Sequence, residues 1–160
     1  MSALPTINLL LEKLAAVGIN LPLGRVTVDG YGDSEALSIE LLALIRSGKK
    51  RAGTGLLWAY QRDGQVIPDQ SDIEIVIDHL NEPVLVTRLT DVQVIPFSNV
   101  TSEYAAIEGE GDGSLEFWRS AHWAYFTREC ARLGLEPSEE MPVICSTFEL
   151  LNVVPTKSAA

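Results

Sequence analysis

Residues 73–95, IEIVIDHLNEPVLVTRLTDVQVI, decide the fold class of this 160-residue chain. Branched aliphatic residues fill both 73–78 and 84–95, which indicates two β-strands. Only five residues, His79 to Pro83, connect them, and asparagine and proline are typical turn residues. A parallel pair would need a crossover of a dozen or more residues. The two strands are therefore predicted to form an antiparallel hairpin.

Two further segments, 54–61 and 143–153, have a similar composition and are also predicted to be strands. Residues Arg62-Asp63-Gly64 follow the first of them and have the composition of a hairpin turn. No helical crossover separates the strands between residues 54 and 95. Antiparallel pairing is therefore expected throughout this part of the chain.

Three helices are predicted from apolar residues that recur at helical spacing. The first ends at Gly18, the second begins after Asp33 or Ser34 and ends at Gly48, and the third runs from about residue 114 to 133. The predicted order is helix, helix, several strands, helix, strand. This order favours an α+β fold in which a small antiparallel β-barrel is surrounded by helices.

The length of the chain predicts a single domain. We place this domain at residues 26–154, preceded by a helical segment 1–25 that packs on the barrel and followed by a loose tail, 155–160. The first residues lack the pattern of a signal peptide, and no apolar run reaches the roughly 18 residues of a membrane span. Cys130 and Cys145 are expected to be free and buried. We expect a cytoplasmic protein without a membrane partner.

The net charge of −10 disfavours extended binding to nucleic acid, because proteins that bind phosphate backbones usually carry a basic face. One local basic patch exists, formed by Arg46, Lys49, Lys50 and Arg51. It belongs to SGKKRAGTGLLWAY, residues 47–60, and a glycine-rich basic turn can hold an anion. The spacing of a P-loop is absent. A turn whose charges point into water explains the same residues.

A second candidate stretch is EYAAIEGEGDGSLEFW, residues 103–118, which contains five acids and no Lys or Arg. Asp112 and Glu116 lie near the start of the third helix, where negative charge is favourable. Glu108 is not explained in this way, and the adjacent Gly109 permits close approach of backbone or ligand. Glu108 is a candidate site carboxylate or an ordinary exposed one, and Glu110 is ambiguous in the same sense.

Other chemistries have weaker support in the sequence. The two histidines, His79 and His122, have no partner at metal-ligand spacing, so we predict neither a metal site nor a cofactor. The aromatic residues of the third helix are assigned to the core. Tyr31 or Trp58 could stack on a base.

Taken together, YGDS at 31–34, SGKKRAGTGLLWAY, VIPFSNV, EYAAIEGEGDGSLEFWRSAHWAYF and MPVICSTFELL resemble the ASCH domain family. The resemblance runs from Tyr31 to Leu151. It implies a PUA-like β-barrel with flanking helices, so that residues 26–154 would form the ASCH domain. Some ASCH proteins are amidohydrolases that remove the acyl group from cytidine acylated on its exocyclic amine. Others are described as ribonucleases that act on single-stranded RNA, or as RNA-binding modules.

The resemblance to the amidohydrolases assigns catalysis to a lysine, a threonine and a glutamate, which fall on Lys50, Thr54 and Glu108. The threonine stands one position later than in the family pattern. A regular strand would separate residues four apart by about 13 Å, so a bulge near Gly53 and Gly55 is needed for a Lys–Thr hydrogen bond. Without the bulge, a water activated by the lysine and the glutamate is the expected nucleophile.

In the expected mechanism, partial desolvation and the charges of Lys49 and Arg51 lower the pKa of Lys50, whereas Glu108 raises it, and neutral Lys50 takes the proton of Thr54. Glu108 orients the lysine, contacts the cytosine or protonates the leaving amine. The expected partner is a small nucleoside, with single-stranded RNA as the alternative, either as the substrate of a ribonuclease or as a ligand bound without turnover. The expected substrate-binding residues are Tyr31, Asp33, Ser34, Lys49, Arg51, Gly53 and Glu110.

Overall fold

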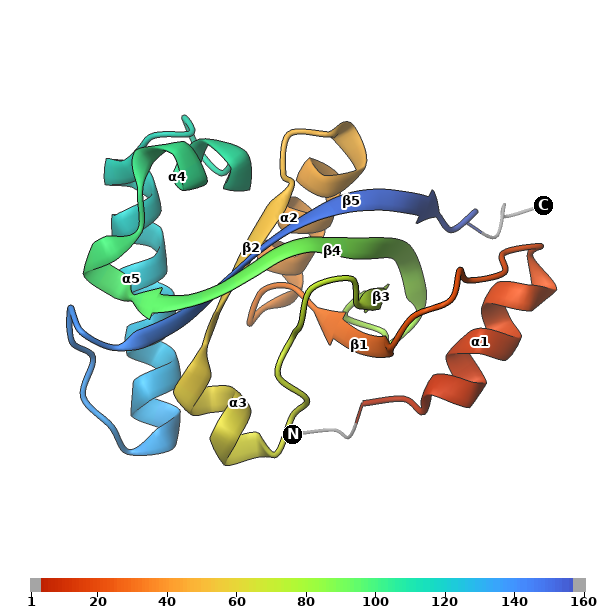
Figure 1. The fold of residues 1–160 in the computed structure, drawn as a ribbon, viewed down its shortest axis with the longest axis horizontal. Coiled ribbons are helices and arrows are strands. Elements are labelled where there is room, and N and C mark those ends of the chain that lie inside the picture. The colour runs from red at the N-terminus through yellow and green to blue at the C-terminus, as the bar shows by residue number, and fades with distance from the viewer. Residues whose placement is uncertain (1–3, 157–160) are drawn as a thin grey trace.

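A computed structural model describes residues 4–156 of the chain, and in this part five strands form one curled sheet (Figure 1). The order across the sheet is β1-β3-β4-β5-β2, so β1 and β2 are its two edges. Neighbouring strands are antiparallel except β1 and β3, which are parallel. The strands are β1 (Val26–Gly30), β2 (Ala52–Leu56), β3 (Ile73–Ile77), β4 (Pro83–Pro96) and β5 (Pro142–Val153).

Five α-helices and a short 3-10 turn surround the sheet in the described residues. Side chains that accept a hydrogen bond from the backbone begin four of the helices, and glycines in the left-handed conformation end α2, α3, α4 and α5. The helices are α1 (Ile7–Ala16), α2 (Glu35–Ser47), α3 (Leu57–Asp63), α4 (Ser102–Glu108) and α5 (Leu115–Leu133), and the 3-10 turn is Phe97–Asn99.

The hairpin predicted from residues 73–95 is confirmed: β3 and β4 pair as antiparallel strands, with Ile77 opposite Pro83. Asn81 adopts a left-handed φ of 63° in the turn, a conformation that asparagine tolerates better than most residues. β4 and β5 are long, and their pairing shifts register at two places, near Thr87 and near Asp91. Such irregularities bend strands, which accounts for the curl of the sheet in Figure 1.

The α+β class with a barrel-like sheet is confirmed, but several boundaries differ from the prediction. Residues 54–61 are not one strand, because the chain leaves β2 at Leu56 and continues as α3. Arg62, Asp63 and Gly64 therefore end a helix and do not connect a hairpin. A short apolar run such as LLWAY fits a buried helix as well as a strand, and its periodicity does not separate the two.

Two elements were not predicted. Residues 26–30, expected to be a loop between glycines, form β1 and pair in parallel with β3. The antiparallel barrel of the prediction therefore contains one parallel pair, which α2, β2 and α3 connect through a long crossover. Residues 102–108 form the short helix α4.

The core consists of three clusters that hold the helices against the sheet. Leu10 and Leu14 of α1 pack with Ile73 and Ile75 on one face of β3, whereas Val76, on the opposite face, packs with α2. The largest cluster packs α5 against β2 and β5. Figure 1 shows the consequence: α1 covers one end of the sheet, and α4 and α5 cover the other. The expected tail 155–160 lies outside the described residues from position 157 onward.

Candidate functional site

A cavity of about 700 Å³ lies between the two edge strands of the sheet, where β1 and β2 do not pair with each other. Gly30 and Tyr31 line it from the β1 side and Gly53 and Thr54 from β2. The segment after α4 and one face of α5 close it. Its volume lies within the range of small-molecule sites.

Lys50 enters this cavity because the chain turns sharply after α2. Gly48 ends the helix with a φ of 88°, and the backbone N–H of Lys50 donates to Leu44 O at 3.1 Å. Lys50 is 1% exposed, although both of its sequence neighbours are more accessible. The turn therefore separates one lysine of the basic patch from the others and buries it.

Glu108 reaches Lys50 because Gly109 allows two backbone segments to approach closely. Gly109 has a φ of 71°, and a Cβ atom at this position would lie 1.9 Å from the carbonyl oxygen of Lys49. Next to this contact, the N–H of Arg51 donates to Ile107 O at 2.9 Å. Only glycine fits here, and its presence places the end of α4 against the start of β2.

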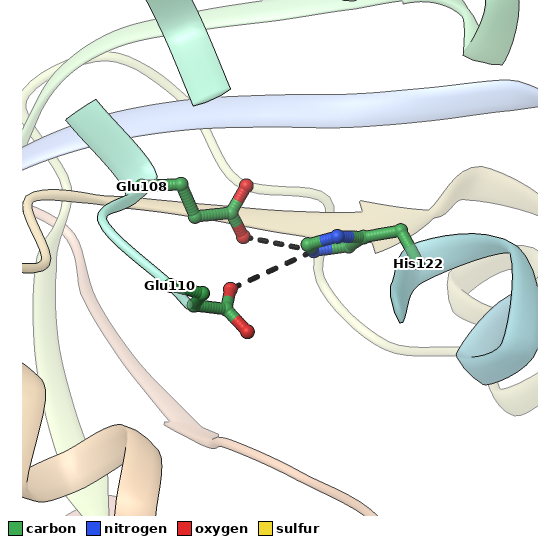
Figure 2. Close-up of side chains that lie close together, drawn as sticks. All are labelled: Glu108, Glu110 and His122. Atoms are coloured by element: carbon green, nitrogen blue, oxygen red, sulfur yellow. Dashed lines mark hydrogen bonds and ion pairs between the residues drawn. The ribbon is translucent and has the colours of Figure 1, made fainter. Parts of the chain in front are cut away.

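The carboxylate of Glu108, 1% exposed, accepts hydrogen bonds from four side chains. Its Oε1 accepts from Lys50 Nζ at 3.2 Å and lies 3.0 Å from His122 Nε2. Its Oε2 accepts from Thr54 Oγ1 at 2.9 Å and from the indole Nε1 of Trp118. Glu108 is therefore the centre of the network, and Figure 2 shows it beside Glu110 and His122.

Glu110 provides a second carboxylate to the same cation. Its Oε2 accepts from Lys50 Nζ at 3.1 Å and lies 3.8 Å from His122 Nε2. In Figure 2, Glu108 at the end of α4 and Glu110 from the segment after it both extend toward the imidazole on α5. Burial, which outweighs the attraction of Lys50, raises the pKa of Glu110.

The surroundings of His122 indicate its protonation. Its Nδ1 lies 2.9 Å from the carbonyl oxygen of Trp118, which can only accept, so Nδ1 carries a proton. Its Nε2 faces the Glu108 carboxylate, so that contact also needs a proton. Burial lowers the pKa of His122, but the charge of Glu108 and their hydrogen bond outweigh burial and raise it. His122 is therefore an imidazolium at the site.

The same charges act on Glu108 in the opposite direction. Burial alone would raise the pKa of this carboxyl, but Lys50 and His122, together with the hydrogen bonds from the imidazole and from Trp118, hold it well below its usual range. Glu108 thus stays an anion between two cations. A buried carboxylate with this many donors is held rigidly in one orientation.

Thr54 reaches the site without the expected bulge. β2 pairs with β5 in unbroken register from Ala52 to Leu56. Lys50 and Thr54 contact different oxygens of Glu108 instead of each other. The Tyr104 hydroxyl lies 3.0 Å from Thr54 Oγ1 and donates to Gly53 O at 2.7 Å. The carboxylate bridges the distance that a regular strand imposes.

The structure separates the expected substrate-binding residues into two groups. Tyr31, Asp33, Gly53 and Glu110 line the cavity. The Tyr31 ring centroid lies 5.6 Å from Lys50 Nζ. The Asp33 carboxylate pairs with Arg128 at 2.7 Å.

The other three residues have different surroundings. Ser34 caps α2 by accepting from the N–H of Leu37. Lys49 is exposed. The Arg51 guanidinium donates to two backbone carbonyls, Ile45 O and Lys50 O. These contacts do not bring the three residues to the cavity wall.

Sequence reasoning missed Tyr104, Trp118 and His122, which were read as core or not considered. Trp118 and His122 are four residues apart on the buried face of α5, and their rings stack with centroids 4.2 Å apart. The polar groups of these side chains could have indicated the site, because a buried indole N–H and a buried imidazole each need a hydrogen-bond partner. An acid in the preceding acidic segment was the natural candidate.

Glu108, Glu110 and His122 are also the residues that could hold a metal ion, because their ligand atoms lie within 4.8 Å of one another. The ammonium of Lys50, however, donates to both carboxylates from 3.1–3.2 Å. It supplies the positive charge that a metal would otherwise bring. A divalent ion at this position would face the charge of Lys50 at close range.

Comparison with known proteins places this geometry in a family. The chain matches the model of the ASCH domain over residues 28–152. It is 31% identical to the ASCH domain of Lactobacillus crispatus, with a TM-score of 0.72 over 79% of each chain. A protein from Enterococcus faecalis is 25% identical, with a TM-score of 0.73 over 89% of this chain and 85% of that one. Among curated proteins, none matches this chain. In the described part of the chain, no helix is long and apolar enough to cross a membrane.

Proposed function

This chain belongs to the ASCH domain family, and from that premise we propose that it is an amidohydrolase acting on a small nucleoside. The reaction removes the acyl group from the exocyclic amine of acylated cytidine or a related base. One observation carries the proposal: a hydroxyl, a carboxylate and an ammonium converge at one wall of the cavity, through Thr54, Glu108 and Lys50. These are the groups that amide cleavage requires, and the reaction uses no cofactor.

The first step is attack of Thr54 Oγ1 on the acyl carbon of the substrate. The hydroxyl already donates to Glu108 Oε2 at 2.9 Å, so the carboxylate is the group that can take its proton. This differs from the expected mechanism in two respects: neutral Lys50 was the base there, and a strand without a bulge left the attack to water. The hydrogen bond from Thr54 to Glu108 provides the hydroxyl with a base that requires no bulge. Because Lys50 and His122 hold the pKa of Glu108 low, the carboxylate relays this proton to the leaving amine as the C–N bond breaks, and the nucleoside departs with a free amino group. An acyl ester on Thr54 remains.

The second step hydrolyses this ester. A water replaces the departed nucleoside, gives its proton to Glu108 and attacks the acyl carbon. The ester C–O bond breaks, the proton returns to Thr54 Oγ1, and the acid leaves. The carboxylate thus serves as base and then as acid in both halves, with atoms and protons balanced.

Lys50 serves a different role in this mechanism. An ammonium has three N–H donors, and two of them are used on Glu108 and Glu110. The third is available to the oxyanion that forms when the acyl carbon becomes tetrahedral. A fixed cation in a site shielded from water stabilises such a charge strongly. The two carboxylates hold the ammonium in place.

The geometry favours a nucleoside over RNA. Lys49 is exposed, and the guanidinium of Arg51 is committed to backbone carbonyls, so the basic patch does not form a phosphate-binding wall. Lys50 itself is neutralised by two carboxylates. Cleavage of single-stranded RNA, or its binding without turnover, remains the alternative outcome of the test.

The test is a spectrophotometric assay of cytidine release from N4-acetylcytidine. We expect release by wild type and by Lys13→Ala, which removes an exposed lysine of α1, and none by Lys50→Ala or Glu108→Ala. Thermal unfolding of each variant separates loss of chemistry from loss of fold. No release by wild type at high enzyme concentration contradicts the proposal, and cleavage of single-stranded RNA across a salt series is then the next measurement.

A further inference from the structure

A second pair of acidic residues, Glu74 and Asp29, lines the same cavity away from the Lys50 network. Glu74 lies in the middle of β3, and its side chain is on the face opposite the isoleucines that pack against α1. Asp29 lies on the adjacent strand β1, where Val76 is its partner in register. Neither residue takes part in the proposed chemistry.

Glu74 is unusual among the buried acids of this chain. It is 4% exposed, and no Lys, Arg or His of the described residues forms an ion pair with it. Its only side-chain hydrogen bond is a long one, 3.4 Å, from Thr87 Oγ1 to Oε1. By contrast, buried Asp72 pairs with Arg25, and Glu108 pairs with Lys50.

The second oxygen of Glu74 keeps some exposure. Every fully buried side-chain nitrogen or oxygen in the described residues has a hydrogen-bond partner, and Oε2 of Glu74 has none, so this atom is not fully buried. Glu74 lines this cavity and also a second one of about 350 Å³, which shares Asp29 and Tyr60 with it. Burying a carboxyl without a partner is costly. A fold that accepts this cost at a cavity wall has a binding group there.

The neighbouring groups define which ligand atoms fit. The Tyr60 hydroxyl donates to Asp29 Oδ2 at 3.3 Å, and the Gly30 N–H donates to Oδ1 at 2.8 Å. Tyr31 follows β1, lines the same cavity and has its ring centroid 5.6 Å from Lys50 Nζ. Burial raises the pKa of Asp29 to about 6 and that of Glu74 to about 8. Near neutral pH the pair therefore offers one anionic acceptor and one neutral acid that can both donate and accept.

We propose that Glu74 and Asp29 bind the sugar hydroxyls of the nucleoside, and that they exclude nucleotides that carry a phosphate on that sugar. The inference rests on the proposed function, because it assumes that the acylated base lies at Thr54 and Lys50. Carboxyl groups accept hydrogen bonds from adjacent hydroxyls, whereas a phosphate placed beside Asp29 would meet an anion. The two arginines that line the cavity, Arg128 and Arg132, are already paired with other acids, Asp33, Asp63 and Glu129.

The test measures binding of the product side of the reaction by calorimetry, which does not depend on hydrolysis. Cytidine, 2′,3′-dideoxycytidine and cytidine 5′-monophosphate are titrated into wild type, Glu74→Leu and Asp29→Asn. Glu149→Gln, which changes an exposed acid of β5, is the matched control. Leucine has a volume close to that of glutamate, but it leaves the buried Thr87 hydroxyl without its acceptor. Thermal unfolding of each variant therefore confirms that it is folded before its binding is compared.

We expect wild type and Glu149→Gln to bind cytidine at least about tenfold more tightly than either analogue, as one lost hydrogen bond to a charged group predicts. Glu74→Leu and Asp29→Asn should lose most of that preference. Equal affinity of wild type for cytidine and the dideoxy analogue overturns the inference, as does an undiminished preference in Glu74→Leu. If hydrolysis of acetylcytidine is observed without a hydroxyl preference, only this inference fails. If the preference is observed without hydrolysis, only the proposed reaction fails.

Discussion

Replacing Glu108 by glutamine tests whether one carboxylate holds the site together. Glu108→Gln keeps the shape of the side chain and removes its charge. The amide offers one oxygen as an acceptor, whereas Glu108 receives four donors on two oxygens. Whichever way the amide turns, its NH₂ group must face either Lys50 and His122 or Thr54 and Trp118. Two donors then lose their acceptor in a site that is 1% exposed.

The expected cost follows from this burial. Removing one partner of a buried ion pair typically destabilises a protein by about 3–5 kcal/mol. In a domain of this size, about 2–4 °C of melting temperature is lost per kcal/mol, so we expect a decrease of about 6–20 °C. Differential scanning calorimetry measures it. Glu149→Gln breaks an exposed ion pair with Arg88, which is worth at most about 1 kcal/mol. Its melting temperature should therefore change by no more than about 2–4 °C.

His122 provides a second measurement on the same variant. Its pKa is raised only because the charge of Glu108 outweighs burial. In Glu108→Gln that charge is gone and burial remains, so the pKa should fall below its wild-type value. The chain contains two histidines, and His79 serves as an internal reference in an NMR titration. An unchanged melting temperature together with an unchanged His122 titration would refute the network described above.

Three further predictions concern Glu74, Gly109 and Thr54. The pKa of Glu74 is raised to about 8, so this group favours the fold most below pH 4.5, and its contribution is lost as pH rises toward 8. In urea unfolding across this range, the free energy of unfolding should fall in wild type and should change less in Glu74→Leu. Gly109→Ala should lower the melting temperature and abolish cytidine release. Its Cβ would lie 1.9 Å from Lys49 O, and its φ of 71° alone costs about 1–2 kcal/mol. A folded, active variant would contradict this account of the turn. Thr54→Ser should keep activity and Thr54→Val should lose it in the acetylcytidine assay, whereas full activity in Thr54→Val would assign the nucleophile to water.

The hairpin could be predicted from sequence because its signal is local. A five-residue connection between two branched aliphatic runs permits only antiparallel pairing. β1 could not be found in this way, because VTVDG is short and its partner β3 lies more than forty residues later. Residues 57–61 were misassigned because an apolar run of this length fits a buried helix or a strand equally well.

The candidate site divides in a similar manner. Lys50, Thr54 and Glu108 are recognisable from their motif, and the structure brings all three to one place. The contact between them was expected to be Lys–Thr, because spacing along one strand was the only geometry that the sequence offered. The role of His122 could not be derived, since an imidazole on an apolar helix face is usually core. Its role depends on a tertiary contact, in which His122 of α5 meets Glu108 at the end of α4.

The electrostatics of the cavity connect the two ends of the site with the charge of the whole chain. At one end, Lys50 and His122 are formally balanced by Glu108 and Glu110, so the wall beside Thr54 carries fixed charges without a net charge. Such a wall can stabilise an oxyanion locally and still offers little attraction to a polyanion from a distance. At the other end, neither Glu74 nor Asp29 forms an ion pair within residues 4–156, and the cavity's Arg128 and Arg132 are paired with other acids. A chain with a net charge of −10 adds long-range repulsion to both ends. A strand of RNA would need positively charged protein groups at both ends of the cavity. The arrangement therefore favours a neutral ligand.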